Sequence, residues 1–481
     1  VEAPDEKALI EAAVQGMIES LDDPYTTYLD ADDLESFDRY IRGSFSGIGA
    51  EVESYEDRLR IVTPLEDSPA WKAGVMAGDV ILEINGQSTL NMELTEAVRL
   101  LTGEEGTQVT VRVRHESGQE ETITITRAVI NIQTVRGFRR NADQHFDFML
   151  DDVNRIGYVR ITQFIEGTAD DLRQALKHLK DQGAKGLILD LRFNPGGLLE
   201  SALAVSDMFL PQGAVIVSVE GRTVPRQVHR ATGNTVMLEL PIVVLANESS
   251  ASAAEIVTGA LKDNHRALFV GARTYGKGSV QQVKMLENGQ GALKLTNAYY
   301  YIPSGRLIHR RPDSTTWGVD PSEGCYVPMS PEAVREMVEI RRRDDQVRAD
   351  NGHAPDAEAT VTPDYIEQEL KDLQLAAALR ALWGRLETSD WPQVGQSNTS
   401  ELVKANQRAA LMMQRDLLVD RLEKIDQELA KLNGQDVAAD DDDSAASRPN
   451  DASADSEDAG DDDAEPAATA PPPTPAPVPV P

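Results

Sequence analysis

The sequence predicts an α/β core that follows a small β-rich domain, with helical regions at both ends and a disordered tail. Apolar strand-like segments alternate with amphipathic helical segments across residues 129–330. Short strand-like segments separated by glycine turns fill residues 43–128. Residues 435–481 are rich in Asp, Ala, Ser and Pro, a composition that cannot bury enough apolar surface to fold.

Bulk composition narrows the function classes. The chain has 481 residues, more than one ordinary core accommodates, so two or three domains are expected. Its net charge of −33 disfavours nucleic-acid binding, because phosphates would be repelled. The single cysteine, Cys325, allows neither an intrachain disulfide nor a cysteine-based metal cluster. Since no apolar run reaches about 18 residues, we expect no membrane span.

Residues 1–42 are predicted to form a helical N-terminal arm, because small and apolar residues recur at helical spacing from Ala8 to Leu21. In residues 43–128, strands are expected at 59–62, 80–84, 109–113 and 121–125, and Asn85-Gly86 is typical of a tight turn. One apolar helical stripe interrupts these strands. It consists of Leu94, Ala97, Val98 and Leu101.

The predicted core, residues 129–330, has helices at 168–182 and 201–209. Its strands are expected at 156–161, 186–192, 215–219, 242–246 and 268–270. The nearly continuous apolar character of 186–192 is typical of a parallel strand that is buried on both faces. We therefore expect a mainly parallel sheet covered by helices.

Residues 331–434 are predicted to be a helical C-terminal region. Its last part carries apolar residues at steps of three and four, the pattern of a short coiled coil, although Arg415 occupies one seam position. The seam residues are Leu411, Leu418, Leu422, Ile425, Leu429 and Leu432. Two explanations remain open: the seam joins two chains in a homodimer, or the helix packs back on its own core.

The tail contains aspartate runs near residues 440 and 461 that could suggest calcium. They lack the glycine and glutamate spacing of a calcium loop, so a solvated acidic tail is the better interpretation. We interpret its proline-rich end as a spacer, with a partner-binding segment as the alternative.

Three turns in the predicted core carry residues suited to acyl transfer. The first, Asn247 to Glu255, joins a strand to a helix through small residues and includes Ser252. Small neighbours allow a substrate carbonyl to approach, and a helix N-terminus favours developing negative charge. Serine is also an ordinary helix cap, so this turn alone would not indicate a nucleophile.

The second turn places Lys277 between Gly276 and Gly278. A lysine that is held away from water loses ammonium solvation, which lowers its pKa towards the range of a general base. The third turn, Asp190 to Gly197, offers backbone amides for an oxyanion hole. Glycine-rich turns also hold exposed lysines, and Asn-Pro-Gly-Gly is a good turn in itself, so the indication comes from all three segments together.

These segments resemble the carboxyl-terminal processing peptidases, also called tail-specific proteases. The resemblance covers roughly residues 6–325 and is carried by four motifs. They are 191–197 (Leu-Arg-Phe-Asn-Pro-Gly-Gly), 250–255 (Ser-Ala-Ser-Ala-Ala-Glu), 274–281 (Thr-Tyr-Gly-Lys-Gly-Ser-Val-Gln) and 298–306 (Ala-Tyr-Tyr-Tyr-Ile-Pro-Ser-Gly-Arg). The resemblance implies a core of the ClpP/crotonase-like kind, a parallel sheet with helices, that acts as a serine protease without a metal or organic cofactor.

The same resemblance assigns roles to individual residues. It makes Ser252 the nucleophile, Lys277 the general base and Gln281 the residue that orients the lysine. The oxyanion donors would be the backbone amides of Gly196 and Ala253. Two further family positions fall on Phe193, where a polar residue is usual, and on Asp263, which we interpret as structural support.

The segment Ser68 to Gly86 resembles the signature of PDZ domains, and the loop Gly47, Ile48, Gly49 and Ala50 resembles their carboxylate-binding loop. Successive backbone amides can hold a terminal carboxylate, while an edge strand accepts the peptide. The stripe Leu94, Ala97, Val98 and Leu101 would line this groove. We therefore expect the domain to bind substrate C-termini and to gate activity. The stretch 102–107 lacks the basic residue of relatives, which leaves a charge-based activation contact in question.

Other interpretations remain. A Ser-His-Asp mechanism would need His265, which we expect to face solvent at a helix end. A PDZ scaffold that binds C-terminal tails without cleaving them is the alternative function, and a regulatory or adaptor protein is a conceivable partner. The resemblance and the start at Val1 suggest a bacterial periplasmic or otherwise exported protein, with membrane association only through a removed N-terminal segment.

Overall fold

The computed structural model describes residues 6–141, 143–286, 291–311, 314–347 and 361–397. It also describes the single positions 408, 411, 415, 418, 419, 421, 422 and 425. The chain divides into two compact units after Leu402, and each unit is treated by itself. The predicted disordered tail, 435–481, lies outside the described residues.

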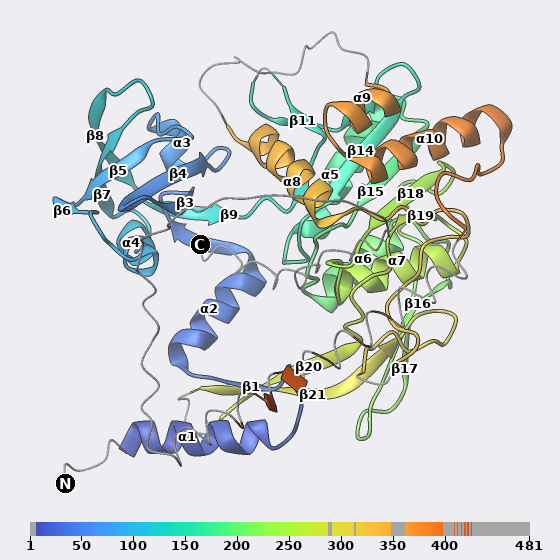
Figure 1. Cartoon of the computed structure of the whole chain (residues 1–481), viewed down its shortest axis with the longest axis horizontal. Coiled ribbons are helices and arrows are strands. Elements are labelled where there is room, and N and C mark those ends of the chain that lie inside the picture. The colour runs from blue at the N-terminus through green and yellow to red at the C-terminus, as the bar shows by residue number, and fades with distance from the viewer. Residues whose placement is uncertain are drawn as a thin grey trace, which may run out of the picture. The chain divides into compact units, whose positions relative to one another are not determined.

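The core is built on a six-stranded sheet (Figure 1). Its order is β10-β14-β15-β18-β19, with β13 beside β14. The four strands from β14 to β19 run parallel, as the sequence predicted. The strands of this sheet are β10 (Val135–Arg136), β13 (Met149–Asp151), β14 (Ile156–Ile161), β15 (Gly186–Asp190), β18 (Ile242–Ala246) and β19 (Leu268–Gly271).

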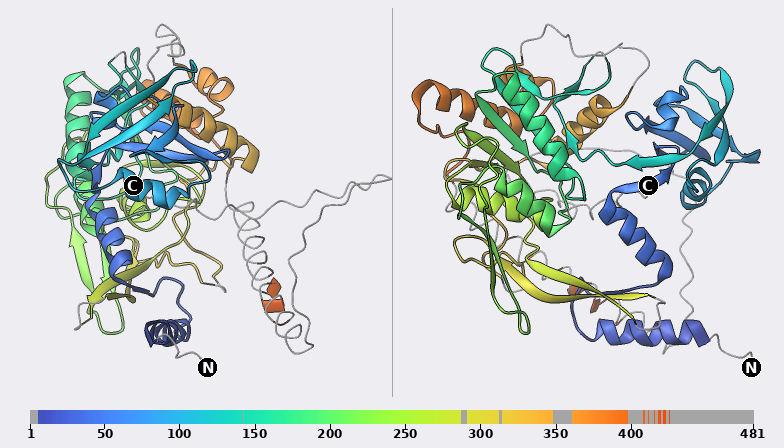
Figure 2. Two further views of the ribbon diagram at one scale, coloured as in Figure 1. Left: turned by 90° about the vertical axis from the view of Figure 1, so that its left-hand side faces the viewer. Right: turned by 180° about the vertical axis from the view of Figure 1, so that it is seen from behind.

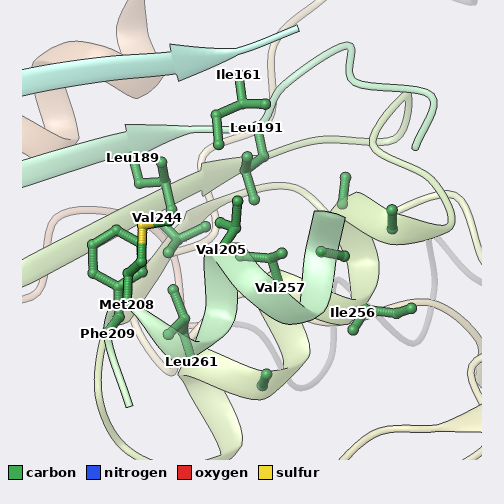
Figure 3. Close-up of a cluster of buried hydrophobic side chains, with 14 of the residues drawn as sticks. Ile161, Leu189, Leu191, Val205, Met208, Phe209, Val244, Ile256, Val257 and Leu261 are labelled. Atoms are coloured by element: carbon green, nitrogen blue, oxygen red, sulfur yellow. The ribbon is translucent and has the colours of Figure 1, made fainter. Parts of the chain in front are cut away.

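Helices cover both faces of this sheet. Alternate strand residues explain why: Leu187 and Leu189 face one apolar cluster, whereas Ile188 faces the other. The first cluster includes α5 (Thr168–Asp181), α6 (Leu199–Asp207) and α7 (Ala253–Asp263), and the second includes α10 (Leu373–Thr388) and α9 (Pro363–Gln368). Figure 3 shows side chains of β15, β18, α6 and α7 gathered in the first cluster. This packing fixes the turns that follow β15 and β18.

A second sheet lies next to the core and has the order β1-β21-β16-β17, with β20 paired to β21 (Figure 2). Its strands are β1 (Thr27–Leu29), β16 (Val215–Glu220), β17 (Gln227–Arg230), β20 (Ser279–Met285) and β21 (Ala292–Tyr301). The predicted helical arm therefore contains α1 (Glu6–Glu19) and α2 (Ala31–Arg42) with a strand between them that the sequence did not predict. Pairing of β1 with β21, a contact across the chain, overrides the local helical pattern.

The β-rich domain has its own sheet, in the order β3-β4-β5-β7-β8 with β6 beside β5. Its elements are β3 (Ala50–Tyr55), β4 (Arg58–Pro64), α3 (Pro69–Lys72), β5 (Val80–Ile84), β6 (Gln87–Ser88), α4 (Leu94–Leu101), β7 (Gln108–Arg114) and β8 (Glu120–Thr126). A separate apolar cluster fills this domain. Strands β2 (Ser44–Gly47) and β9 (Ala128–Asn131) pair where the chain enters and leaves it.

The remaining short strands are β11 (Arg139–Arg140) and β12 (Phe146–Asp147), which pair with each other. After the core, α8 (Pro331–Asp345) begins at an N-cap, Ser330, whose hydroxyl accepts from Ala333 N. In the second unit, the described seam positions are helical and exposed in the single chain. Leu429 and Leu432 of the predicted seam lie outside the described residues.

Candidate active site

Ser252 lies at the N-terminus of α7, directly after the turn that follows β18. Its backbone has φ 55° and ψ −116°, a conformation that residues other than glycine rarely adopt. Such strain persists only where surrounding contacts enforce it, and it is concentrated at functional sites. The side chain is partly exposed, so a substrate can reach it.

The turn that contains Gly196 contacts the Ser252 turn closely. A Cβ at Gly196 would lie 2.6 Å from Ser252 Cβ and 2.9 Å from Ala253 N, and the residue has φ +101°. Only glycine fits this position. The amide of Ala253, at the first helical position, has no partner within the helix. The two predicted oxyanion donors are thus brought next to the predicted nucleophile.

One of these donors is engaged. Gly196 N donates to Asn194 Oδ1 at 2.8 Å, while Asn194 Nδ2 donates to the Ile161 carbonyl at 2.8 Å. Asn194 is fully buried. An oxyanion at Gly196 would therefore have to share or displace the Asn194 oxygen, a competition that the sequence did not predict.

Lys277 lies on the turn between β19 and β20 and is half-buried. Burial lowers the pKa of its amine, and the positive charge of Lys294 lowers it further, whereas Glu255 and Asp23 oppose this shift. Among the described contacts, no hydrogen bond joins Ser252 Oγ to Lys277 Nζ. The environment of Lys277 nevertheless lowers the pKa of its amine, which is the direction that a general base requires.

A buried carboxylate connects the two turns. Glu255, which has no exposed surface, accepts hydrogen bonds from Ser252 N at 2.9 Å and from Lys277 N at 2.8 Å on the same oxygen. Its other oxygen accepts from Thr274 Oγ1 at 2.6 Å and Gly276 N at 2.7 Å. Burial raises the pKa of Glu255 to about 7, although these four donors favour its ionised form. Glu255 therefore sets the spacing of the Ser252 and Lys277 backbones.

Tyr300, on β21, also contacts both turns. Its hydroxyl donates to the Lys277 carbonyl. Burial and the charge of Glu255 raise the pKa of Tyr300 well above its ordinary value, and an interaction with the Ser252 side chain opposes that rise. Tyr300 belongs to the motif 298–306, but the sequence assigned it no role. Its position follows from the pairing of β20 and β21, which the sequence did not predict.

Gln281 lies on β20, and its side-chain amide donates to Ser279 Oγ at 2.9 Å and Thr296 Oγ1 at 3.2 Å. No hydrogen bond between Gln281 and Lys277 occurs among the described contacts, so its orienting role stays a prediction. Asp263 accepts from Ser304 N at 3.0 Å.

His265 and His309 differ in their position relative to the predicted dyad. His265 is exposed at the end of α7. His309 is the histidine near Lys277, because a Cβ at Gly278 would lie 2.8 Å from His309 N. Burial lowers the pKa of His309, which keeps its ring neutral near pH 7. The sequence analysis missed this residue, since it stands in no recognisable motif.

Comparison with known proteins identifies the family of this chain. The model of peptidase family S41 matches residues 155–322, a PDZ-domain model matches 60–115, and a model of the activating protease CtpB N-terminal domain matches 1–33. The carboxy-terminal-processing protease of Bartonella bacilliformis is 42% identical over 316 residues, which are 64% of this chain and 69% of that protein. The chain belongs to the carboxy-terminal-processing peptidases of family S41.

Two further proteins are similar to this chain. Carboxy-terminal processing protease CtpA of Bacillus subtilis is 40% identical over 307 residues, which are 64% of this chain and 63% of CtpA. The match thus spans less than two thirds of that relative. The solved photosystem II D1 C-terminal processing protease is 32% identical, with 68% of this chain and 84% of that one covered and a TM-score of 0.41.

In this S41 chain, the residues predicted to bind a peptide lie on α4 and between the end of β2 and the start of β3. Leu94 and Val98 are partly exposed, whereas Ala97 and Leu101 are buried in the core of the PDZ domain. Gly47 at the end of β2 and Ile48 and Gly49 after it are buried, and Ala50, the first residue of β3, is partly exposed. The Ile48 and Gly49 carbonyls accept from Ala70 N and Leu65 N. Assignment of these residues to a C-terminus stays a prediction.

Membrane spans and metal sites are both absent from the described residues of this S41 chain. None of its described helices combines the length and apolarity needed to cross a membrane. No group of three or more His, Cys, Asp or Glu side chains is arranged to hold a metal ion in the described part of the chain.

Proposed function

We propose that the protein is a serine endopeptidase that uses a Ser252–Lys277 dyad to cleave proteins near or from their C-termini. The observation that supports this most strongly is the contact of Glu255 with the backbones of both residues. A single buried carboxylate holds a strained serine at a helix N-terminus beside a lysine whose pKa is lowered. An accessible serine at a helix N-terminus and a lysine of lowered pKa are features of an activated nucleophile and its base.

The proposed reaction has two steps. Ser252 Oγ attacks the scissile carbonyl while neutral Lys277 accepts the hydroxyl proton, and the Gly196 and Ala253 amides stabilise the oxyanion. The leaving amine takes that proton from Lys277 as the C–N bond breaks. Water then attacks the Ser252 ester, and the acid product leaves as Ser252 regains its proton. Gln281 is proposed to orient Lys277 during both steps.

The test compares wild type, Ser252→Ala and Lys277→Ala on an unfolded protein with an apolar C-terminus. We expect cleavage to be lost in both variants and retained in Ser249→Ala and Lys284→Ala, which change exposed residues of the same types nearby. Full activity in Lys277→Ala would contradict the dyad. Binding without cleavage by wild type would favour the PDZ scaffold instead.

The PDZ domain is proposed to capture substrate C-termini and to gate the active site. Contacts between this domain and neighbouring segments give it a route to do so: Arg342 pairs with Glu53 at 2.7 Å, and Arg140 with Glu66 at 3.0 Å. Deletion of residues 44–127 should change cleavage rates on proteins with apolar C-termini. Unchanged rates on every substrate would exclude gating.

A homodimer and export from the cytoplasm remain proposals. Exposed apolar residues on the described seam, Leu411, Leu418 and Leu422, support a helix pairing between chains. Sedimentation of the full chain and of a chain ending at Thr399 should show loss of the dimer in the shorter one. Cell fractionation of the native protein tests the exported location.

A further inference from the structure

The segment between α1 and α2 lies against the catalytic turns, although it precedes Ser252 by more than two hundred residues in sequence. Strand β1 pairs with β21, with Thr27 opposite Lys294 (Figure 1). Thr26, which is buried, accepts from Thr296 N at 3.2 Å and bonds Asp23 through its hydroxyl. These contacts fix the segment on β21. Strand β21 also pairs with β20, which begins at Ser279, two residues after Lys277.

Tyr25 is the residue of this segment that reaches the lysine. The Nζ atom of Lys277 lies 4.9 Å from the centroid of the Tyr25 ring, within the range of a cation–π interaction. The Tyr25 ring also contacts His309, at 6.2 Å between centroids in an edge-on arrangement. Burial and the neighbouring Tyr275 hydroxyl raise the pKa of Tyr25, so its hydroxyl stays neutral.

We propose that Tyr25 is a positioning residue for Lys277: its ring covers the amine, restricts its rotamers and shields it from water. The proposal rests on the proposed role of Lys277 as general base. The ring serves both protonation states. It excludes water while the amine is neutral, and its negative face stabilises the ammonium that forms when Ser252 gives up its proton.

Other groups also face Lys277. Glu255 of α7 and Asp23 of the N-terminal segment favour the ammonium form, and Lys294 of β21 disfavours it. Tyr300 binds the Lys277 carbonyl, not the amine. His309 lies beside Gly278, as described above. These charged groups remain in place in a Tyr25 variant. Tyr25→Ala removes the cover of the amine together with the ring contact to His309 and the hydroxyl contact to Tyr275, whereas Tyr25→Phe removes the hydroxyl contact alone.

The experiment measures kcat and kcat/KM against pH on a short fluorogenic peptide, using the full chain. Burial is the main cause of the lowered pKa of Lys277, so Tyr25→Ala should move the acid limb of the profile to higher pH. We expect a shift of about one unit and a fall in kcat of about tenfold at neutral pH, with KM little changed. Tyr25→Phe, which keeps the ring, should match wild type.

The matched control is Tyr55→Ala. Tyr55 places its ring 4.1 Å from the guanidinium carbon of Arg60, the same kind of contact within the PDZ sheet. This variant should leave the acid limb in place. An unmoved limb and unchanged kcat in Tyr25→Ala would overturn the proposal, and so would an equal loss in Tyr25→Phe, which would assign the effect to the hydroxyl.

Two safeguards keep the result decisive. If Tyr25→Ala does not fold, Tyr25→Leu keeps the apolar bulk without a ring face, and we expect a severalfold lower kcat; a wild-type kcat there would also overturn the proposal. Ser252→Ala and Lys277→Ala are measured alongside. If they stay active, the dyad itself is wrong; if they are inactive while Tyr25 variants behave as wild type, only the role of Tyr25 fails.

Discussion

Two buried carboxylate sites of this protein differ in the groups that balance their negative charge. Asp190, at the end of β15, binds the guanidinium of Arg192, and Asp372 at the N-terminus of α10 binds the same group. The Arg192 side chain has no exposed surface. Glu255, equally buried, accepts only from neutral donors.

The difference appears in their ionisation. Burial disfavours ionised Asp190, yet Arg192 and Arg341 outweigh it and hold the Asp190 pKa well below its ordinary range. At Glu255 burial prevails, and the pKa rises to about 7. Buried carboxylates that are paired with arginine mainly have a structural role. A buried carboxylate without a cation, whose pKa lies near 7, is typical of functional sites.

The largest effect should come from breaking the arginine-paired carboxylate site. Arg192→Met leaves Asp190 and Asp372 buried with Arg341 as their remaining cation, at 3.4 and 3.1 Å, and should lower the free energy of unfolding by about 3 to 5 kcal/mol. Urea denaturation measures this. In the control Arg380→Met, which removes a partly exposed ion pair with Glu367, we expect a loss below about 1 kcal/mol. Equal losses of unfolding free energy in the two variants would show that the buried ion pairs stabilise the fold no more than an exposed pair does.

The pH dependence of stability should separate the two carboxylate sites by sign. Because the folded pKa of Glu255 lies above its unfolded value, stability falls as pH rises from about 4.5 to about 7, by roughly 3 kcal/mol. The lowered pKa values of Asp190 and Asp372 act oppositely, so their contribution is lost only as pH falls below about 4. Urea midpoints of wild type and Glu255→Gln across this range test the first statement. A slope that persists in Glu255→Gln would assign it to another group.

A smaller effect should follow from removing one donor to Glu255. Thr274 Oγ1 donates to Glu255 and accepts from Val319 N at 2.7 Å, so Thr274→Val removes the acceptor of Val319 N and leaves that Glu255 oxygen with Gly276 N as its donor. We expect a loss of about 1 to 3 kcal/mol and a severalfold lower kcat, measured by urea unfolding and peptide cleavage. Thr122→Val, at an exposed position of β8, is the control and should change neither. Normal kcat in Thr274→Val would argue against Glu255 as a spacer of the dyad.

The sequence predicted the parallel sheet because Leu187 to Leu189 and Val243 to Leu245 are apolar on both faces, a signal that local reading can detect. It also singled out Ser252 and Lys277 as a predicted dyad, since their turns carry compact motifs, and the backbones of both residues bond Glu255. Glu255 was quoted within such a motif, but its four hydrogen bonds depend on how two distant turns meet. Tyr25 and Tyr300 were missed as site residues because long-range pairing of β1, β20 and β21 places them there.

The most direct test of the central claim is detection of the acyl-enzyme. Wild type is mixed with a peptide ester, quenched in acid within the first turnover, and examined by intact and fragment mass spectrometry. The account predicts an added acyl group on Ser252 in wild type, and strongly reduced acylation in Lys277→Ala. An acyl group on another residue, or equal acylation of Ser252 without Lys277, would contradict the Ser252–Lys277 dyad.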